Sequence, residues 1–165
     1  MELARSRVKV DVELKEEGYE NSAIEFLTRY LNEDEFVITS FSDLSLKTVK
    51  DHFPEVKAGL LLGKPRPDNP FRTRLSELFP MKRSRRVNAD FLAPHFRLLR
   101  FGFLGRAERN CKPIFVWTVN NEKMISKFIN DHRIEAIITD RPEVALDIRG
   151  KIFANWQAIT GKSTP

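Results

Sequence analysis

Glu13 and Lys15 stand two residues apart at the end of a stretch in which apolar and polar residues alternate. In a β-strand this spacing places both side chains on the same face. A carboxylate beside an ammonium group suits a divalent metal ion that carries a bound phosphate. A surface ion pair at a strand end would show the same spacing, and position alone does not decide between the two interpretations.

Other chemically capable side chains also stand where an apolar run stops, among them Phe41, His95, Trp117 and Asp140. Trp117 would wall a pocket or fill the core, because a tryptophan buries a large apolar area. His95 follows Pro94, and an imidazole titrates near neutral pH, so it is a candidate acid or base. Asp140 would either contact a substrate or cap the helix that follows.

The elements that must position these side chains are six apolar runs separated by helix-forming segments. We expect strands at residues 8–14, 35–41, 57–62, 87–94, 113–119 and 134–139. Strands that alternate with helices indicate a parallel sheet, whose sites form at the carboxyl ends of the strands. Because no glycine-rich phosphate loop follows the first strand, an incomplete TIM-type (β/α)8 barrel of about six strand–helix units is favoured over an open doubly wound sheet.

Composition bounds the remaining possibilities. The 165 residues carry a net charge of +5, 41% are hydrophobic, and Cys111 is the single cysteine. We expect a partial barrel over residues 1–150, followed by a helix end and tail over residues 151–165. No apolar run approaches the ~20 residues of a membrane span, and no secretory signal is evident, so a soluble cytoplasmic protein is expected. The basic run at residues 82–86 suggests nucleic-acid binding, but a solvated loop before a buried strand is the preferred interpretation.

At several of these positions the chain resembles the glycerophosphodiester phosphodiesterase family. The similar elements are Val12-Glu13-Leu14-Lys15, Thr39-Ser40-Phe41, Gly59-Leu60-Leu61-Leu62, Asn88-Ala89-Asp90-Phe91-Leu92-Ala93-Pro94-His95, Trp117-Thr118-Val119-Asn120 and Ile138-Thr139-Asp140-Arg141-Pro142. Each element is weakly diagnostic, but their order and spacing together are specific. The resemblance covers nearly the whole chain.

The resemblance implies a metal-dependent hydrolase that cuts a small glycerophosphodiester into glycerol 3-phosphate and an alcohol, with Mg²⁺ or Ca²⁺ as the cation. By resemblance, Glu13 is the metal ligand, Lys15 contacts the phosphate, and Trp117 lines the pocket, with Phe41 making a weaker claim to that role. The catalytic histidines of the family lie elsewhere in its domain. His95 is therefore expected to line the pocket, with a catalytic role as the less favoured alternative.

Three further elements of the family are absent from this sequence: a His-Arg pair, a Glu-x-Asp pair and a second histidine followed by aspartate. Phosphodiester cleavage needs an acid, a base and a cation with several oxygen ligands. We therefore expect activity to require a missing N-terminal segment. The alternative is a catalytically inactive remnant that binds a partner or self-associates, and nucleic-acid binding ranks last.

Overall fold

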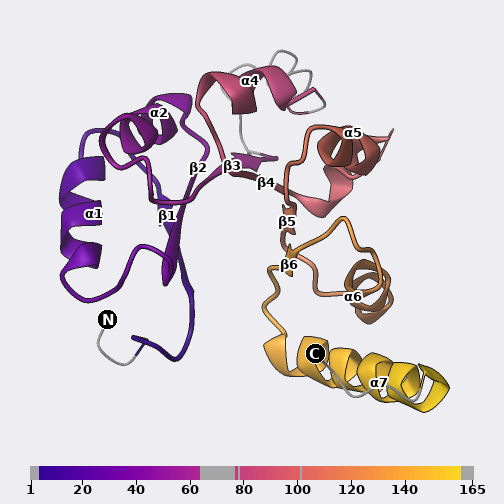
Figure 1. The fold of residues 1–165 in the computed structure, drawn as a ribbon. Helices are drawn as coiled ribbons and strands as arrows, with labels where there is room; N and C mark the ends of the chain where they lie inside the picture. Colours follow the sequence, from indigo (N-terminus) through magenta and orange to yellow (C-terminus); the bar gives the residue numbers. More distant parts are fainter. Residues whose placement is uncertain (1–3, 64–76, 78, 101, 161–165) are drawn as a thin grey trace.

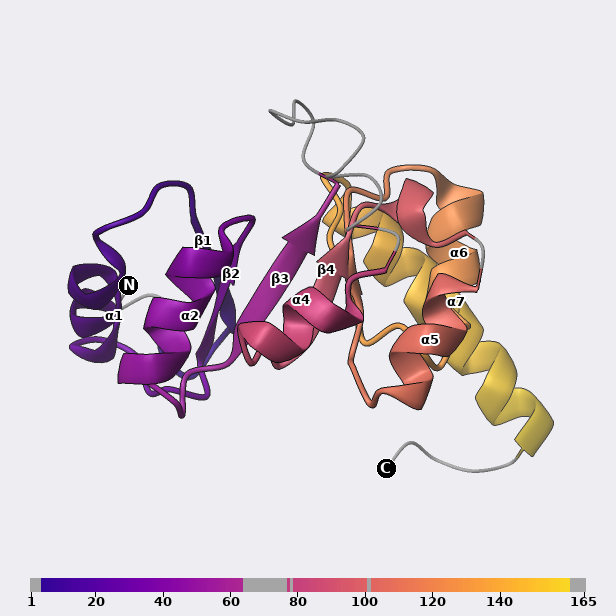
Figure 2. The ribbon, with the colours of Figure 1, turned by 90° about the horizontal axis from the view of Figure 1, so that it is seen from above.

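The computed structural model describes residues 4–63, 77, 79–100 and 102–160 of the chain. Within them, parallel strands alternate with helices, and the strands form a curved wall with the helices outside it (Figure 1). Seen from above, α5, α6 and α7 gather at the end of the molecule opposite α1 and α2 (Figure 2). The curvature and the strand order make the fold an incomplete parallel α/β barrel, as predicted.

The strands follow one another in the sheet in the order of the sequence. The first sheet contains β1 (Val10–Leu14), β2 (Phe36–Ser40), β3 (Ala58–Leu62) and β4 (Phe91–Pro94), and the second contains β5 (Phe115–Val116) and β6 (Ala136–Ile137). Parallel bridges from Leu92 to Ile114 and from His95 to Trp117 join β4 to the β5 segment. In the described part of the chain, β1 pairs only with β2 and β6 only with β5, so both ends of the wall are open edges.

Seven helices are described, and some of them begin at a residue suited to a helix start. They are α1 (Glu20–Thr28), α2 (Asp43–His52), α4 (Met81–Arg86), the short 3-10 helix η1 (Phe96–Leu98), α5 (Phe103–Arg109), α6 (Glu122–Ile129) and α7 (Pro142–Thr160). The side chain of Ser42 accepts a hydrogen bond from the Ser45 amide at the start of α2, and Asn121 caps α6 in the same way through the Met124 amide. Pro142 opens α7, as expected of a residue that has no amide hydrogen to satisfy.

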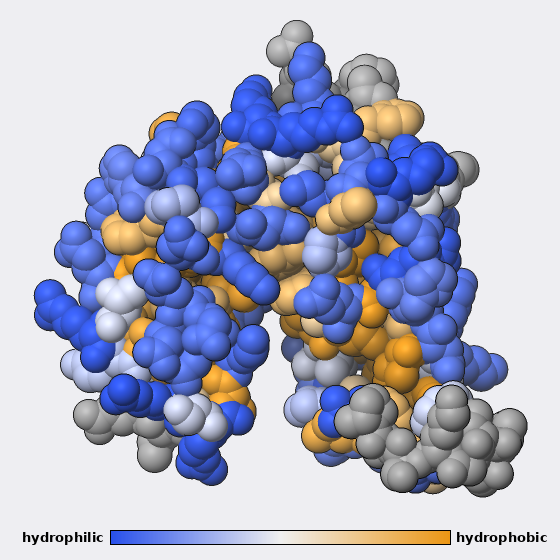
Figure 3. Space-filling view, in the orientation of Figure 1, coloured by the Kyte–Doolittle hydropathy of each residue, from blue (hydrophilic) through white to orange (hydrophobic). Residues whose placement is uncertain are grey.

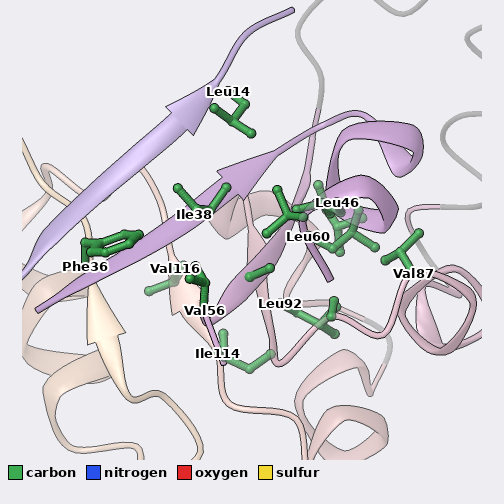
Figure 4. Close-up of a cluster of buried hydrophobic side chains, with 14 of the residues drawn as sticks. Leu14, Phe36, Ile38, Leu46, Val56, Leu60, Val87, Leu92, Ile114 and Val116 are labelled. Carbon is green, nitrogen blue, oxygen red and sulfur yellow. The ribbon is translucent and has the colours of Figure 1, made fainter. Parts of the chain in front are cut away.

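Alternation along the strands divides the apolar side chains between the two faces of the wall. On the outer face, residues such as Ile38, Leu60 and Leu92 are fully buried against the helices (Figure 4). On the concave face, Leu61 and Phe91 belong to a separate small cluster that also contains Ala93. Adjacent residues of one strand therefore serve different cores.

Two of the predicted elements are wrong. The basic run at residues 82–86 is not a solvated loop but most of α4, because Arg83 and Arg86 form ion pairs with Asp43 at the start of α2. The fourth strand begins at Phe91 rather than at Val87, since Asn88 adopts a left-handed turn with φ 51°.

Three further features complete the fold. The predicted C-terminal helix end corresponds to the last part of α7 (Pro142–Thr160), and the tail over residues 161–165 lies outside the described residues. Among the described residues, no helix is long and apolar enough to cross a membrane. Figure 3 shows apolar surface on the lower right part of the molecule, which carries α6 and α7 in Figure 1. The large apolar side chains of Leu146, Phe153 and Trp156, all on α7, are exposed.

Candidate functional site

A cavity of about 320 Å³ opens on the concave face of the wall. Its lining comes from β1, β2, β3 and the segments around β5 and β6: Asp11, Glu13, Thr39, Phe41, Leu61, Trp117, Thr118 and Ile138. Three of the residues predicted from the sequence, Glu13, Phe41 and Trp117, are therefore brought together. Every lining residue on a strand occupies the face opposite to the main core, so the strand period itself directs these side chains into the cavity.

Glu13 and Lys15 form an ion pair at the rim of this cavity. The Lys15 Nζ lies 2.6 Å from the Glu13 Oε2, and the Lys15 side chain is 72% exposed whereas that of Glu13 is 32% exposed. Exposed ion pairs of this kind contribute little to stability. The ammonium group is thus free to reorient towards an anion that approaches the rim.

The aromatic side of the cavity is rigidly held. The rings of Phe41 and Trp117 meet edge to face with centroids 5.9 Å apart, and the indole Nε1 of Trp117 donates to the Ala93 carbonyl oxygen over 2.7 Å. A third ring, that of His95, is nearly perpendicular to the Trp117 ring, with centroids 5.0 Å apart. Trp117 therefore presents a fixed apolar face to anything bound in the cavity.

His95 does not line the cavity. Its Nδ1 accepts a hydrogen bond from the Arg97 amide over 3.3 Å, which makes it the cap of η1, and the backbone amide of His95 donates to the Leu62 carbonyl at the end of β3. The side chain supports Trp117 from outside the cavity. Its catalytic role thus stays a prediction, while its observed contacts are those of a residue that positions the indole.

Asp11 is the principal residue that the sequence analysis missed. It lies two residues before Glu13 on the same face of β1, and the Thr39 hydroxyl donates to its Oδ1 over 2.9 Å. Desolvation by the cavity walls raises the pKa of Asp11, the Thr39 hydrogen bond lowers it, and the charge of Glu13 raises it further. Asp11 is an exposed residue of β1, which pairs only with β2 among the described strands. The two-residue spacing that drew attention to Glu13 and Lys15 would also have identified Asp11.

The donor set suits part of a hard divalent cation site. Mg²⁺ and Ca²⁺ prefer oxygen ligands and take six or more of them. Asp11 and Glu13 offer carboxylate oxygens at the cavity, but no group of three or more histidine, cysteine or acidic side chains is arranged to hold a metal ion among the described residues. The described residues could therefore supply only some of the oxygen ligands that such a cation needs.

Asp140 belongs to a neighbouring polar cluster rather than to the cavity. Its Oδ2 accepts from the Asn120 side-chain amide over 2.7 Å, and its backbone amide donates to the Asn120 Oδ1 over 2.9 Å. These contacts fasten the segment after β6 to the segment after β5. The described contacts of Asp140 are consequently structural.

A curved wall of parallel strands with carboxylates and aromatic rings on its concave face defines a barrel-type α/β protein with a polar site at its mouth. The model of the glycerophosphoryl diester phosphodiesterase family matches residues 6–144. The chain therefore belongs to this family, as its sequence elements predicted.

The relatives agree with this assignment. A glycerophosphodiester phosphodiesterase of Caldanaerobacter subterraneus subsp. tengcongensis is 28% identical over 131 residues, which cover 79% of this chain and 49% of that protein. The chain thus spans about half the length of this curated relative.

Solved structures are similar in fold. A glycerophosphodiester phosphodiesterase of Parabacteroides distasonis superimposes with a TM-score of 0.71 at 18% identity, covering 90% of this chain and 60% of that one. A phosphodiesterase of Oleispira antarctica, solved in complex with the product sn-glycerol-3-phosphate, gives a TM-score of 0.68 at 18% identity and covers 85% of this chain and 54% of that one. At these identities the likeness shows the fold.

Proposed function

We propose that this chain forms the Glu-Lys and aromatic part of a glycerophosphodiester phosphodiesterase site, which hydrolyses a small glycerophosphodiester to glycerol 3-phosphate and an alcohol. The observation that carries the proposal is the convergence of Glu13, Phe41 and Trp117 on one cavity, with Lys15 at its rim, in a chain that matches the family over residues 6–144. The product named for the Oleispira antarctica relative supports the substrate class.

Each residue has a distinct part in this proposal. Glu13 would hold the divalent cation, Mg²⁺ or Ca²⁺, which when bound supplies positive charge to the phosphoryl oxygens. Lys15 would turn from Glu13 towards the phosphate, where its ammonium group adds a second positive charge. Trp117 and Phe41 would pack against the carbon chain of the substrate, and His95 would hold the Trp117 ring in place.

Catalysis also needs a group that activates the nucleophile and one that protonates the leaving oxygen. Among the described residues, the cavity lining holds carboxylates and hydroxyls but no histidine. We therefore propose that full activity depends on two further strand–helix units that close the barrel between β6 and β1, because an eight-stranded barrel needs two more than the six strands described here.

The test is hydrolysis of glycerophosphocholine by the purified chain with Mg²⁺ or Ca²⁺, followed as release of glycerol 3-phosphate. Glu13→Gln should abolish release, whereas Glu33→Gln, which changes an exposed acid elsewhere, should leave it unchanged. Equal release by wild type and Glu13→Gln would remove Glu13 from the mechanism. If the chain alone releases nothing, binding of glycerol 3-phosphate in the presence of the cation decides whether the site exists.

A binding or self-associating module is the second candidate, and one observation favours it. A groove of about 940 Å³ runs between α6, β6 and α7, and the exposed side chains of Leu146, Phe153 and Trp156 line it. Exposed apolar patches of this kind commonly mark association surfaces. Light scattering at several protein concentrations tests this candidate: a monomer throughout would reject self-association, while a dimer that Phe153→Ser dissociates would support it.

A further inference from the structure

The positive charge of the chain is concentrated in one stretch that the cavity does not use. Residues 79–112 contain nine lysines and arginines against two acidic residues, a net charge of +7, whereas the remaining residues carry a net charge of −2. The stretch includes α4 and α5, which lie outside the wall, while the cavity opens on its concave face (Figure 1). The excess of positive charge therefore needs an explanation separate from the proposed function.

Side chains from α4 and α5 form one continuous surface, which we call the basic face: Lys82, Arg85, Arg86, Arg106 and Arg109. The three residues from α4 share one side of that helix, because residues three and four apart lie on the same side, and the two from α5 are likewise three apart. The Arg85 Nη2 donates to the Oδ1 of Asn110, directly after α5, over 2.6 Å and so joins the two helices. Figure 3 shows hydrophilic surface at the top of the molecule, where α4 lies in Figure 1.

Little of the charge on the basic face is neutralised by acidic neighbours. Lys82, Arg85 and Arg109 are exposed, and no acidic side chain among the described residues forms an ion pair with any of them. Arg86 pairs with Asp43, yet its side chain is 67% exposed. The single acidic residue of α5 pairs with a histidine from another segment. The face is therefore available to an anionic partner.

A large apolar side chain lies beside the basic face. Phe79 comes three residues before Lys82 and is 59% exposed, and the Arg106 guanidinium lies over its ring, 5.1 Å from the centroid. Basic side chains next to an exposed aromatic ring are typical of surfaces that bind the interface of a membrane, where the cations meet anionic headgroups and the ring enters the acyl boundary. A nucleic-acid backbone offers no apolar layer for such a ring.

The packing of α4 also disfavours a nucleic acid as the partner. A helix that reads a major groove enters the groove and presents its side chains to the base edges. The six residues of α4 instead lie against the rest of the molecule, since Ser84 in its middle and Val87 directly after it are buried. A positive surface of this kind, with one exposed ring, suits a bilayer.

We infer that the basic face and Phe79 bind the surface of an anionic phospholipid bilayer. Each lysine or arginine close to such a surface strengthens binding roughly five-fold, and the attraction falls off within a Debye length. The binding is peripheral and reversible, because it combines a few cations with one aromatic ring. It leaves the cavity on the opposite face of the wall open.

The test is cosedimentation of the full chain with vesicles of phosphatidylcholine that contain about one-third phosphatidylglycerol, compared with vesicles of phosphatidylcholine alone. The chain should bind the mixed vesicles and not the neutral ones, and added salt should release it. Lys82→Gln, Arg85→Gln and Arg109→Gln combined should weaken binding about a hundred-fold, at roughly five-fold for each lost charge. Phe79→Ser should weaken binding about ten-fold and leave its dependence on salt unchanged.

The matched control combines Arg7→Gln, Lys9→Gln and Arg29→Gln, which removes the same charge from exposed positions next to β1 and α1. This control should weaken binding less than about five-fold. Arg85→Lys with Arg109→Lys keeps the charge and should keep the binding, which separates the loss of charge from a loss of structure. Circular dichroism of each variant establishes that it is folded.

Three results would overturn the inference. They are no binding to the mixed vesicles, equal binding by the two triple glutamine variants, and binding to a DNA duplex in the same buffer without binding to vesicles, which would assign the basic face to nucleic acid. None of these results concerns hydrolysis at the cavity, so failure of this inference and failure of the proposed function are distinguishable.

Discussion

Gly59 is the position where the geometry makes the sharpest stability prediction. It lies in β3, with its α-carbon facing the cluster on the concave side of the wall. A β-carbon added there would overlap the ring carbons Cε2 and Cζ of Phe91 and lie 2.7 Å from Cδ2. Phe91 is 3% exposed and stacks on Phe115 with ring centroids 4.2 Å apart, so its ring has little room to retreat.

Gly59→Ala should therefore destabilise the fold by about 2 kcal/mol, within the range of roughly 1–3 kcal/mol observed when a methyl group is forced into a packed core. For a chain of this size the corresponding fall in melting temperature is roughly 4–8 °C. Urea unfolding followed by circular dichroism measures the change. Because the strain lies against one ring, Gly59→Ala combined with Phe91→Leu should cost about 1 kcal/mol less than the sum of the two single changes.

Gly150→Ala is the control, since a β-carbon at Gly150 meets no atom within 4 Å and the residue lies within α7. Alanine there should stabilise the helix by about 0.5–1 kcal/mol. The reasoning about Gly59 would be refuted if Gly59→Ala unfolded at the same urea concentration as wild type, or if the double change showed strict additivity.

Three further predictions concern other contacts. The hydrogen bonds from Arg133 lower the pKa of Asp131 to about 2. The resulting stabilisation of the fold is therefore complete above pH ~4 and is lost as the pH falls through 2. Asp131→Asn should lower the free energy of unfolding by about 1–2 kcal/mol at pH 7 and by almost nothing near pH 2, as measured by urea unfolding at a series of pH values. Lys50 is buried and donates hydrogen bonds to the backbone carbonyls of Pro54 and Val56 and to the Asp90 carboxylate. Because Lys50→Met removes these donors, it should lower the free energy of unfolding by about 3–5 kcal/mol, and a loss under 1 kcal/mol would contradict this account. Ser42→Ala removes the α2 cap and should cost about 1 kcal/mol in chemical denaturation, whereas an unchanged midpoint would show that the cap is dispensable.

Much of the fold is predictable because its strands follow one simple rule. The alternation of the apolar residues Val10, Val12 and Leu14 with polar residues locates β1. Capping residues such as Ser42 and Asn121 locate the starts of helices. These patterns involve residues close together in the sequence, so they can be recognised without knowledge of the tertiary structure.

The errors arise where tertiary contacts decide the local structure. The sequence of α4 is dominated by like charges, which favours a solvated loop, yet Asp43 from another helix neutralises Arg83 and Arg86. No local pattern contains that information. The beginning of β4 was misplaced for a related reason, because the left-handed turn at Asn88 breaks an otherwise strand-like run.

The site was predictable to the extent that it follows strand spacing. Glu13 lies on the concave face by the same alternation that buries Leu14, and Asp11 follows from that spacing too. The placement of His95 was not predictable in this way. Its contacts depend on the turn into η1 and on the proximity of Trp117 from another strand.

The division of each strand between two cores bears on how this protein tolerates changes in length. In β3, Leu60 supports the helices while Leu61 faces the cavity, and they are neighbours in sequence. Loss of a single residue within the strand would exchange the two sets, so that leucines meant for the helices would fill the cavity. Insertions and deletions should therefore be confined to the connections between elements, while point substitutions at every second strand position can remodel the cavity and leave the scaffold in place.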